Sequence, residues 1–433
     1  MMRTTATLLA TAAMLTACGG GGGSPAAQIG AGPPLPGQNQ YLLPPMHIAK
    51  PAPWNGALPS VPAGLKVTAF ADGFANARSV FTLPNGDVLV VEPKGPPTVV
   101  FRPKDILASW IKGFGHSKTK GGDRITLLRD ADGDGRPELR TVFLDHLHSP
   151  FGVALVGGDL YVADTDAILR FPYQTGTTRI TAPGAVLTEL PAGAIDHHWT
   201  KSLVASPDGS KLYVGIGSNS NITENGIDAE QERARIWEVD RATGAHRPYA
   251  TGLRNPNGLQ FEPQTGKLWA VVNERDELGP DLVPDYLTSV TPGAFYGWPW
   301  SYWGRHVDPR VRPKRPDMVD RAISPDYSLS SHVAPLGMVF DTGASLPAPY
   351  RGGAFVGEHG SWDRGNLNGY KVVWVPFTGG RPSGPAKDVL TGFLDGQGHA
   401  RGRPVGLALD RTGALLVADD LANVVWRVTA AAS

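Results

Sequence analysis

Six hairpin-like segments recur along this 433-residue chain, and they constrain its fold more than any other feature. Each has a short apolar stretch, a turn rich in Pro, Asp, Asn or Gly, and a second apolar stretch that ends in Glu, Asp or Gly. A turn of this composition between two apolar stretches is typical of a β-hairpin. The segments are residues 79–92, 152–164, 203–215, 258–274, 337–341 with 353–358, and 406–420.

An isolated hairpin cannot bury its apolar faces, so repeated hairpins must pack on one another. Their spacing of about 50 to 80 residues leaves room for four strands per repeat, and radial packing of four-stranded sheets gives a β-propeller. The 54 Gly, 39 Pro and 11 Trp suit a turn-rich all-β chain. We therefore predict an all-β, six-bladed β-propeller over residues 54–433. A β-sandwich is the alternative, but it leaves the recurrence unexplained.

The first residues have the form of an export signal. Arg3 precedes an apolar run from Leu8 to Leu15, which is shorter than the about 20 residues that span a bilayer. The ending Leu-Thr-Ala-Cys18 resembles a bacterial lipobox, and Cys18 is the only cysteine, so no internal disulfide can form. We expect a lipoprotein signal peptide at 1–17 and lipidation at Cys18. The alternative is an ordinary secretory signal with an incidental cysteine.

The segment that follows is rich in Gly and Pro. Gly19–Gly23 and the Pro-rich residues up to Pro53 predict a flexible tether over 18–53. The chain is then an exported bacterial lipoprotein that faces the periplasm or the cell surface. It meets the membrane only through its lipid anchor.

Composition and missing motifs exclude several function classes. The chain has 40 basic and 40 acidic residues and only 18% charged residues, so nucleic acid is not an expected partner. It has no Gly-x-Gly-x-x-Gly opening a helix, no P-loop and no Gly-x-Ser-x-Gly elbow, which leaves nucleotide cofactors and serine hydrolysis unsupported.

Two polar motifs carry the chemistry. Asp196-His-His-Trp-Thr-Lys-Ser-Leu203 places a histidine pair ahead of a predicted strand, and Gly252-Leu-Arg-Asn-Pro-Asn-Gly258 places an Arg-Asn pair at a turn. The histidine pair could supply a base and the Arg-Asn pair an anion-binding group. These are the two polar groups needed to remove a proton and a hydride from an alcohol. A histidine pair in a loop is also a common hydrogen-bonded surface feature.

These motifs belong to an ordered set. The set is Arg124–Gly135, His198–Leu203, Gly252–Gly258, Val272–Asp276, Gly279–Tyr286, Tyr296–Pro299, Gly357–Arg364 and Gly402–Pro404. In that order, from about Leu65 to Val428, the chain resembles the soluble pyrroloquinoline-quinone (PQQ) dependent sugar dehydrogenases, and most closely their sorbosone-dehydrogenase-like branch. The resemblance implies a six-bladed propeller, in agreement with the hairpin count.

The resemblance also implies site residues. PQQ carries three carboxylates and an ortho-quinone, which favours arginine in its pocket. The matching positions are Arg254, Asn255, Arg364, Arg401 and Arg403. Arg254 would polarise the reactive carbonyl, and His198 would be the general base, with His197 as the runner-up. Lys371 is the weaker alternative to Arg364 where glucose-oxidising members have a lysine.

Calcium is the second implied cofactor. In the family, backbone carbonyls of a Gly-Pro pair hold it, and this chain has Glu274, Arg275 and Asp276 at that place. Separately, Asp130, Asp132, Asp134 and Gly135 follow the first half of an EF-hand-type loop. The twelfth position, where an EF-hand has a bidentate Glu, is Thr141, and Glu138 is the later carboxylate in the loop. The sequence is therefore compatible both with a structural Ca²⁺ site and with a simple turn that binds no ion.

The sequence thus predicts a PQQ-dependent dehydrogenase of a sugar or sugar aldehyde. The chain has no Cys-x-x-Cys-His haem motif, so we expect an external electron acceptor. One alternative is a calcium-dependent lactonase-like propeller that would use Asn257, Asn273 and Glu274. The other is a non-catalytic binding propeller.

Overall fold

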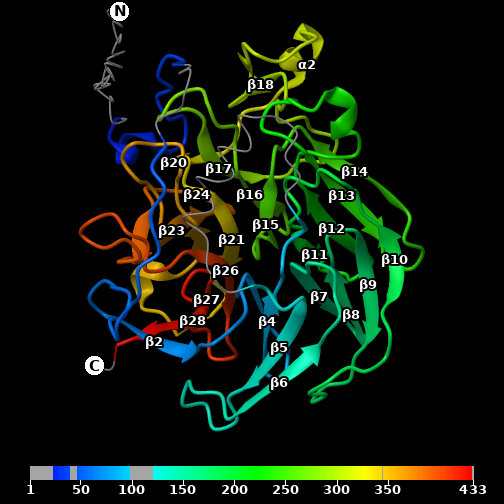
Figure 1. The fold of residues 1–433 in the computed structure, drawn as a ribbon, viewed down its shortest axis with the longest axis vertical. Coiled ribbons are helices and arrows are strands. Elements are labelled where there is room, and N and C mark those ends of the chain that lie inside the picture. The colour runs from blue at the N-terminus through cyan, green and yellow to red at the C-terminus, as the bar shows by residue number, and fades with distance from the viewer. Residues whose placement is uncertain (1–22, 40–45, 98–119, 344, 432–433) are drawn as a thin grey trace, which may run out of the picture.

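The computed structural model describes residues 23–39, 46–97, 120–343 and 345–431. Within them, six antiparallel sheets of at least four strands follow one another around a central axis, in colour order from blue to red (Figure 1). This confirms the predicted all-β, six-bladed β-propeller. Each predicted hairpin forms the two innermost strands of one blade, because its apolar faces are buried between neighbouring sheets.

The blades are built from consecutive strands. Blade 1 contains β3 (Ser79–Thr82), β4 (Val88–Glu92), β5 (Arg124–Arg129) and β6 (Leu139–Leu144). Blade 2 contains β7 (Gly152–Val156), β8 (Asp159–Ala163), β9 (Ala167–Pro172) and β10 (Ala185–Glu189). Blade 3 contains β11 (Leu203–Ala205), β12 (Lys211–Ile216), β13 (Arg235–Asp240) and β14 (His246–Thr251), with the 3-10 helix η2 (Ile227–Glu230) in its loop.

Blades 4 and 5 contain short elements in addition to their four main strands. Blade 4 contains β15 (Pro256–Phe261), β16 (Leu268–Val272), β17 (Pro284–Ser289) and β20 (Tyr327–Ser331). Between β17 and β20 it carries β18 (Ser301–Tyr302), β19 (His306–Val307) and α2 (Pro316–Arg321). Blade 5 contains β21 (Pro335–Phe340), η3 (Ala348–Tyr350), β22 (Gly353–Glu358), β23 (Lys371–Thr378), β24 (Arg381–Pro382) and β25 (Lys387–Leu390).

Blade 6 closes the ring with strands from both ends of the propeller. It contains β26 (Pro404–Leu409), β27 (Leu415–Asp419) and β28 (Val424–Ala430), and its outer strand is β2 (Leu65–Ala71). Leu65 pairs with Ala430 and Val67 with Val428, and Figure 1 shows blue β2 beside red β28. This pairing joins the first and last blades without a loose edge between them.

The N-terminal segment differs from the expected flexible tether over 18–53. Its described part, residues 23–39 and 46–53, lies against the propeller, and we call it the strap. η1 (Pro25–Gln28) leads into β1 (Ile29–Gly30), which pairs with β20 of blade 4. The physical reason is Gln28, which is 5% exposed and whose Oε1 accepts from Ser331 Oγ at 2.8 Å. A composition rich in glycine and proline predicts a flexible segment, but it cannot predict that the Gln28 side-chain amide is buried against the propeller.

The predicted signal peptide at 1–17 and Cys18 lie outside the described residues. Among the residues described, no helix is long and apolar enough to cross a membrane.

Candidate active site on the propeller axis

The strand order places the predicted functional residues on one face. In each blade the innermost strand starts at this face and the second strand returns to it, because the two are antiparallel. Their ends carry the loops that hold His198, Arg254, Asp276, Arg364 and Arg403. The Asp130 loop joins β5 to β6 and therefore lies at the opposite face.

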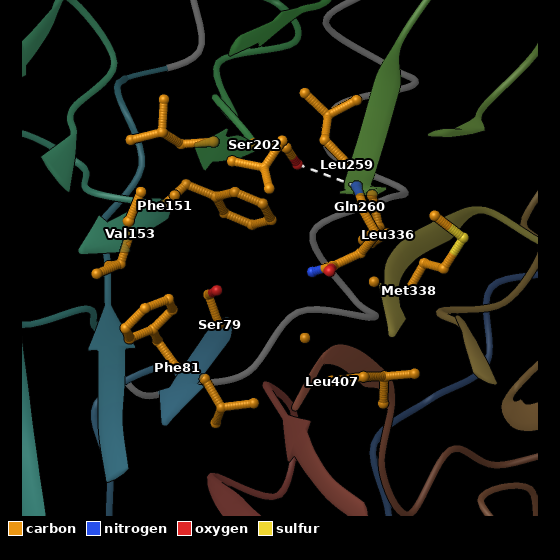
Figure 2. A pocket seen from close by; sticks show the side chains of 18 of the residues that line it. Ser79, Phe81, Phe151, Val153, Ser202, Leu259, Gln260, Leu336, Met338 and Leu407 are labelled. Atoms are coloured by element: carbon orange, nitrogen blue, oxygen red, sulfur yellow. Dashed lines mark hydrogen bonds between the residues drawn. The ribbon is translucent and has the colours of Figure 1, made fainter. Parts of the chain in front are cut away.

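An axial pocket runs between the inner strands of all six blades (Figure 2). Its walls are mostly backbone and apolar side chains, including Phe81, Phe151 and Leu407. Ser202 Oγ accepts a hydrogen bond from the Gly258 N–H at 3.1 Å and so joins blade 3 to blade 4. Polar side chains lie in the loops at the end of the axis where the inner strands begin, and we call them the axial ring: Arg78, His198, Asn255, His359, Arg403 and Asp420.

His198 has the geometry of a general base. Its Nδ1 lies 2.9 Å from the Ser218 carbonyl oxygen, which can only accept, so Nδ1 carries the proton and Nε2 is the basic nitrogen. Burial lowers the pKa of His198 well below its usual range, and the neighbouring Arg254 lowers it further. A neutral imidazole at pH 7 follows. His197, the runner-up, is exposed and contacts His198 edge to face, with ring centroids 4.5 Å apart.

Gly217 brings His198 and Asn255 together. A Cβ at position 217 would lie 2.4 Å from His198 Cβ and 2.5 Å from Asn255 Oδ1, so only glycine allows this approach. Asn255 is buried, and its Oδ1 has no hydrogen-bond partner within the described residues. His198 therefore lies beside a buried polar atom that has no hydrogen-bond partner among the described residues.

Arg254 has a different environment from the one expected for a cofactor clamp. It is 3% exposed, and its guanidinium donates to the carbonyl oxygens of Asn221 (3.2 Å) and Glu274 (2.7 Å). Its Nη2 lies 3.3 Å from Asp276 Oδ2. Arg254 therefore holds the loops of blades 3 and 4 together and acts on His198 through its charge.

A second polar group on the axis involves Arg78 and Asp420, which the sequence analysis did not select, and His359, which lies in the Gly357–Arg364 motif. Arg78 directly precedes β3, forms an ion pair with Asp420, and lies over the Trp199 ring at 5.8 Å. His359 Nε2 lies 3.0 Å from Asp420 Oδ2. Burial would raise the pKa of Asp420, but His359 and Arg78 outweigh it, so the pKa is lowered and the carboxylate stays charged.

Arg403 completes this group. It directly precedes β26, and its guanidinium lies over the Tyr370 ring at 5.9 Å. The Nε atoms of Arg403 and Arg78 are both buried without a hydrogen-bond partner. Both arginines stand immediately before the innermost strand of their blades, and this shared position is the signal that could have identified Arg78 from the sequence.

Arg364 and Arg401 lie elsewhere. Arg364 is fully buried, donates to the Pro280 carbonyl oxygen at 2.6 Å and pairs with Asp281 at 3.0 Å, so its guanidinium is used inside the protein. Arg401 is half-buried over the Trp54 ring at 5.9 Å. The alternative, Lys371, pairs with Asp388 on β25.

The calcium donors expected at 274–276 do not converge. The carbonyl oxygens of Glu274 and Asp276 already accept from Arg254 and Asn221. The Arg275 side chain is buried against Asp308 at 3.1 Å. Two of the expected carbonyl donors therefore serve buried protein groups, which does not match the carbonyl-held calcium that the resemblance implies, whereas Glu274 Oε1 is buried without a hydrogen-bond partner among the described residues.

Asp276 instead meets two residues that the sequence analysis missed. The side chains of Asp276, His332 and Asp363 come from three separate loops, and one ligand atom from each lies within 4.8 Å of the others. Burial would lower the pKa of His332, but Asp276 and Asp363 outweigh it and raise it to about 9. No sequence spacing links these residues, because the fold alone brings the loops together.

The Asp130 loop gathers its carboxylates as an EF-hand-type loop would. Asp130, Asp132, Asp134 and Glu138 lie within 4.8 Å by one oxygen each. Asp130 accepts from the Gly133 and Gly135 N–H groups at 2.8 and 2.9 Å, and Glu138 from the Ala131 N–H at 2.7 Å. Hydrogen bonds from backbone N–H groups of the loop therefore hold Asp130 and Glu138 in place.

The fold and the axial ring define a β-propeller with a polar site on its axis. The sequence profile of the Glucose / Sorbosone dehydrogenase family matches residues 157–361, and a TrAA12-like profile matches 317–431. The resemblance to the soluble PQQ-dependent sugar dehydrogenases is therefore confirmed, with the family match lying over residues 157–361.

Two relatives are similar to this chain in sequence. An uncharacterised protein of Borreliella burgdorferi is 30% identical over 241 residues, which is 55% of this chain and 62% of that protein. A pyrroloquinoline quinone-dependent sugar dehydrogenase of Hypocrea jecorina is 23% identical over 332 residues, 65% of this chain and 73% of that enzyme.

Solved structures agree on the fold. The PQQ domain of Coprinopsis cinerea pyranose dehydrogenase has a TM-score of 0.69 at 20% identity and covers 88% of this chain and 100% of that domain. The calcium structure of a Trichoderma reesei family AA12 enzyme has a TM-score of 0.70 at 19% identity, over 89% and 99% of the two chains.

Proposed function

We propose that this protein is a PQQ-dependent oxidoreductase that oxidises a sugar or sugar aldehyde and passes the electrons to an external acceptor. The proposal rests mainly on the environment of the His198 side chain. Its Nδ1–H is fixed on Ser218, and burial keeps the imidazole neutral with a basic Nε2. These are the properties of a general base that works at neutral pH.

The axial ring suits an anionic cofactor. Arg78 and Arg403 each have a buried Nε without a partner, and Asn255 has a buried, unpartnered Oδ1. PQQ carries three carboxylates, so Arg78 and Arg403 would hold it from blades 1 and 6. When bound, PQQ supplies an ortho-quinone that accepts the two electrons of the oxidation as a hydride.

The protein's own part in the reaction is proton removal. As the substrate carbon gives up a hydride, its hydroxyl proton is taken by His198 Nε2, and the charge that develops on the ring is shared through Nδ1–H with the Ser218 carbonyl oxygen, 2.9 Å away. The cation of Arg254 lowers the pKa of the resting imidazole and so keeps it deprotonated until substrate arrives.

The cellular setting is part of the proposal. The lipobox-like sequence ending at Cys18 supports an exported lipoprotein that faces the periplasm or cell surface. Membrane labelling by a radioactive fatty acid should then be lost in Cys18→Ser. Labelling that survives this change would show that the anchor is elsewhere.

The experiment is a PQQ titration of the full chain followed by a panel of aldoses and sugar aldehydes with a dye as acceptor. We expect stoichiometric binding and reduction by substrate. Arg403→Ala and Arg78→Ala should each weaken PQQ binding by about 10- to 100-fold, since a hydrogen bond to a charged group contributes about 1.5–3 kcal/mol.

The matched control is Arg401→Ala, because the guanidinium of Arg401 lies over the Trp54 ring. It should leave PQQ affinity unchanged. Failure of PQQ to bind would contradict the proposal, and lactone hydrolysis, the metal-dependent alternative, would then be measured next.

A further inference from the structure

The loops of blades 4 and 5 bring together three side chains that the proposed oxidation does not use. Asp276 follows β16, His332 follows β20, and Asp363 follows β22. His332 is 5% and Asp363 1% exposed, whereas the Asp276 side chain is 18% exposed. The cluster is therefore buried on two sides and reachable on the side of Asp276.

The spacing of the donor atoms suits a small divalent ion. His332 Nδ1 lies 3.3 Å from Asp276 Oδ1, and one oxygen of Asp363 lies within 4.8 Å of both residues' donor atoms. Bonds of about 2.0–2.2 Å around a tetrahedral ion place neighbouring donor atoms about 3.3–3.6 Å apart. The distance between His332 and Asp276 already has this value, and the Asp363 oxygen lies within 4.8 Å of both donor atoms.

Each side chain is also held from outside the cluster. His332 Nε2 lies 3.1 Å from the Gly279 carbonyl oxygen, so Nε2 carries a proton and Nδ1 faces Asp276. Asp363 Oδ2 accepts from the Glu277 N–H at 2.8 Å. Asp276 Oδ2 lies 3.3 Å from Arg254 Nη2. A carbonyl on the far nitrogen of a histidine and donors behind the carboxylates are the usual supports of metal ligands.

We propose that Asp276, His332 and Asp363 form a site for a divalent transition metal such as Zn²⁺ or Mn²⁺. One histidine nitrogen and two carboxylate groups, gathered from three loops, form a donor set that such ions accept. An imidazole donor favours these ions over Ca²⁺, which prefers oxygen ligands alone. None of the residues proposed to hold PQQ belongs to this cluster.

Such an ion would tie three loops that carry or support the axial ring. Asp276 touches Arg254, whose charge acts on His198, and Asp363 is followed by the buried Arg364 that binds blade 5 to Asp281. The metal would therefore brace the side of the axial ring formed by blades 4 and 5.

The test is metal content of the full chain, stripped with a chelator and then dialysed against Zn²⁺, Mn²⁺ or Ca²⁺ in turn. All variants carry Glu138→Gln, which removes a ligand from the separate Asp130 loop. We expect one equivalent of Zn²⁺ or Mn²⁺. His332→Gln and Asp363→Asn should weaken its binding by more than the roughly 10- to 100-fold that loss of a supporting partner costs.

A second readout identifies the ligand atom directly. Electron spin-echo spectra of bound Mn²⁺ should show coupling to an imidazole nitrogen, and that coupling should vanish in His332→Gln. Thermal unfolding of the metal-free variants checks that they fold. The proposal is overturned if folded protein takes up no Zn²⁺ or Mn²⁺, if both variants bind as the parent does, or if no nitrogen coupling appears. In each of those cases a proton held by His332 occupies the place between the carboxylates.

Discussion

At the residue scale, His198 and Arg254, the two residues that the sequence motifs indicated most strongly, differ in what their side chains contact. His198 presents a basic nitrogen at the axis, whereas Arg254 donates to Asn221, Glu274 and Asp276. The sequence identifies the residue types at both positions. It cannot show that Arg254 is 3% exposed, because burial depends on loops that follow β12 and β16.

The environment of His198 predicts how activity depends on pH. Its pKa is lowered in the folded protein, so kcat/KM should stay level from alkaline pH down to the ordinary histidine value of about 6.5 and fall only below it. The folded state also binds fewer protons than the unfolded state, so the same group lowers stability as pH falls below about 6.5. A pH–rate profile whose acid limb has its midpoint at or above 6.5 would contradict this assignment.

At the element scale, the strap is the largest departure from the sequence analysis. Composition alone predicted a tether, yet Asn39 N donates to the Leu278 carbonyl oxygen and His47 N to that of Trp362. These contacts join the strap to the same two loops that hold Asp276 and Asp363. They could not be predicted, since each joins residues more than 200 positions apart in the chain.

The strap makes a stability prediction. Gln28→Ala removes the acceptor of the buried Ser331 hydroxyl and should lower the free energy of unfolding by about 1–3 kcal/mol. Urea unfolding measures this, with the exposed Gln174→Ala as the control. Equal stability of the two variants would mean that the strap is not held by Gln28.

The Asp130 loop makes a prediction about metal removal. If Ca²⁺ binds there, calcium at 100 times its dissociation constant should stabilise the protein by about 2.7 kcal/mol, and a chelator should reverse this. Asp132→Asn with Glu138→Gln should abolish the effect, because these variants remove two of the four gathered carboxylates. If the melting temperature does not change with calcium, the loop is a simple turn that binds no ion.

At the scale of the whole molecule, the six-fold repeat could be predicted because each hairpin is local in sequence. The closure could not, since Leu65 pairs with Ala430 across nearly the entire propeller. The ring matters for function because Arg78, His198, His359 and Arg403 come from four blades and meet only when it is closed. The cluster of Asp276, His332 and Asp363 was missed because no sequence spacing links its three loops.

The most direct test of the account is single-turnover reduction of PQQ bound to the full chain, in the parent protein and in His198→Ala. The account predicts equal PQQ affinity in both and reduction by the best sugar that is about 10²- to 10⁴-fold slower in His198→Ala, the usual contribution of a general base. His197→Ala, which changes the exposed neighbour, should reduce the quinone at the parent rate. A His198→Ala protein that keeps the parent rate would contradict the account.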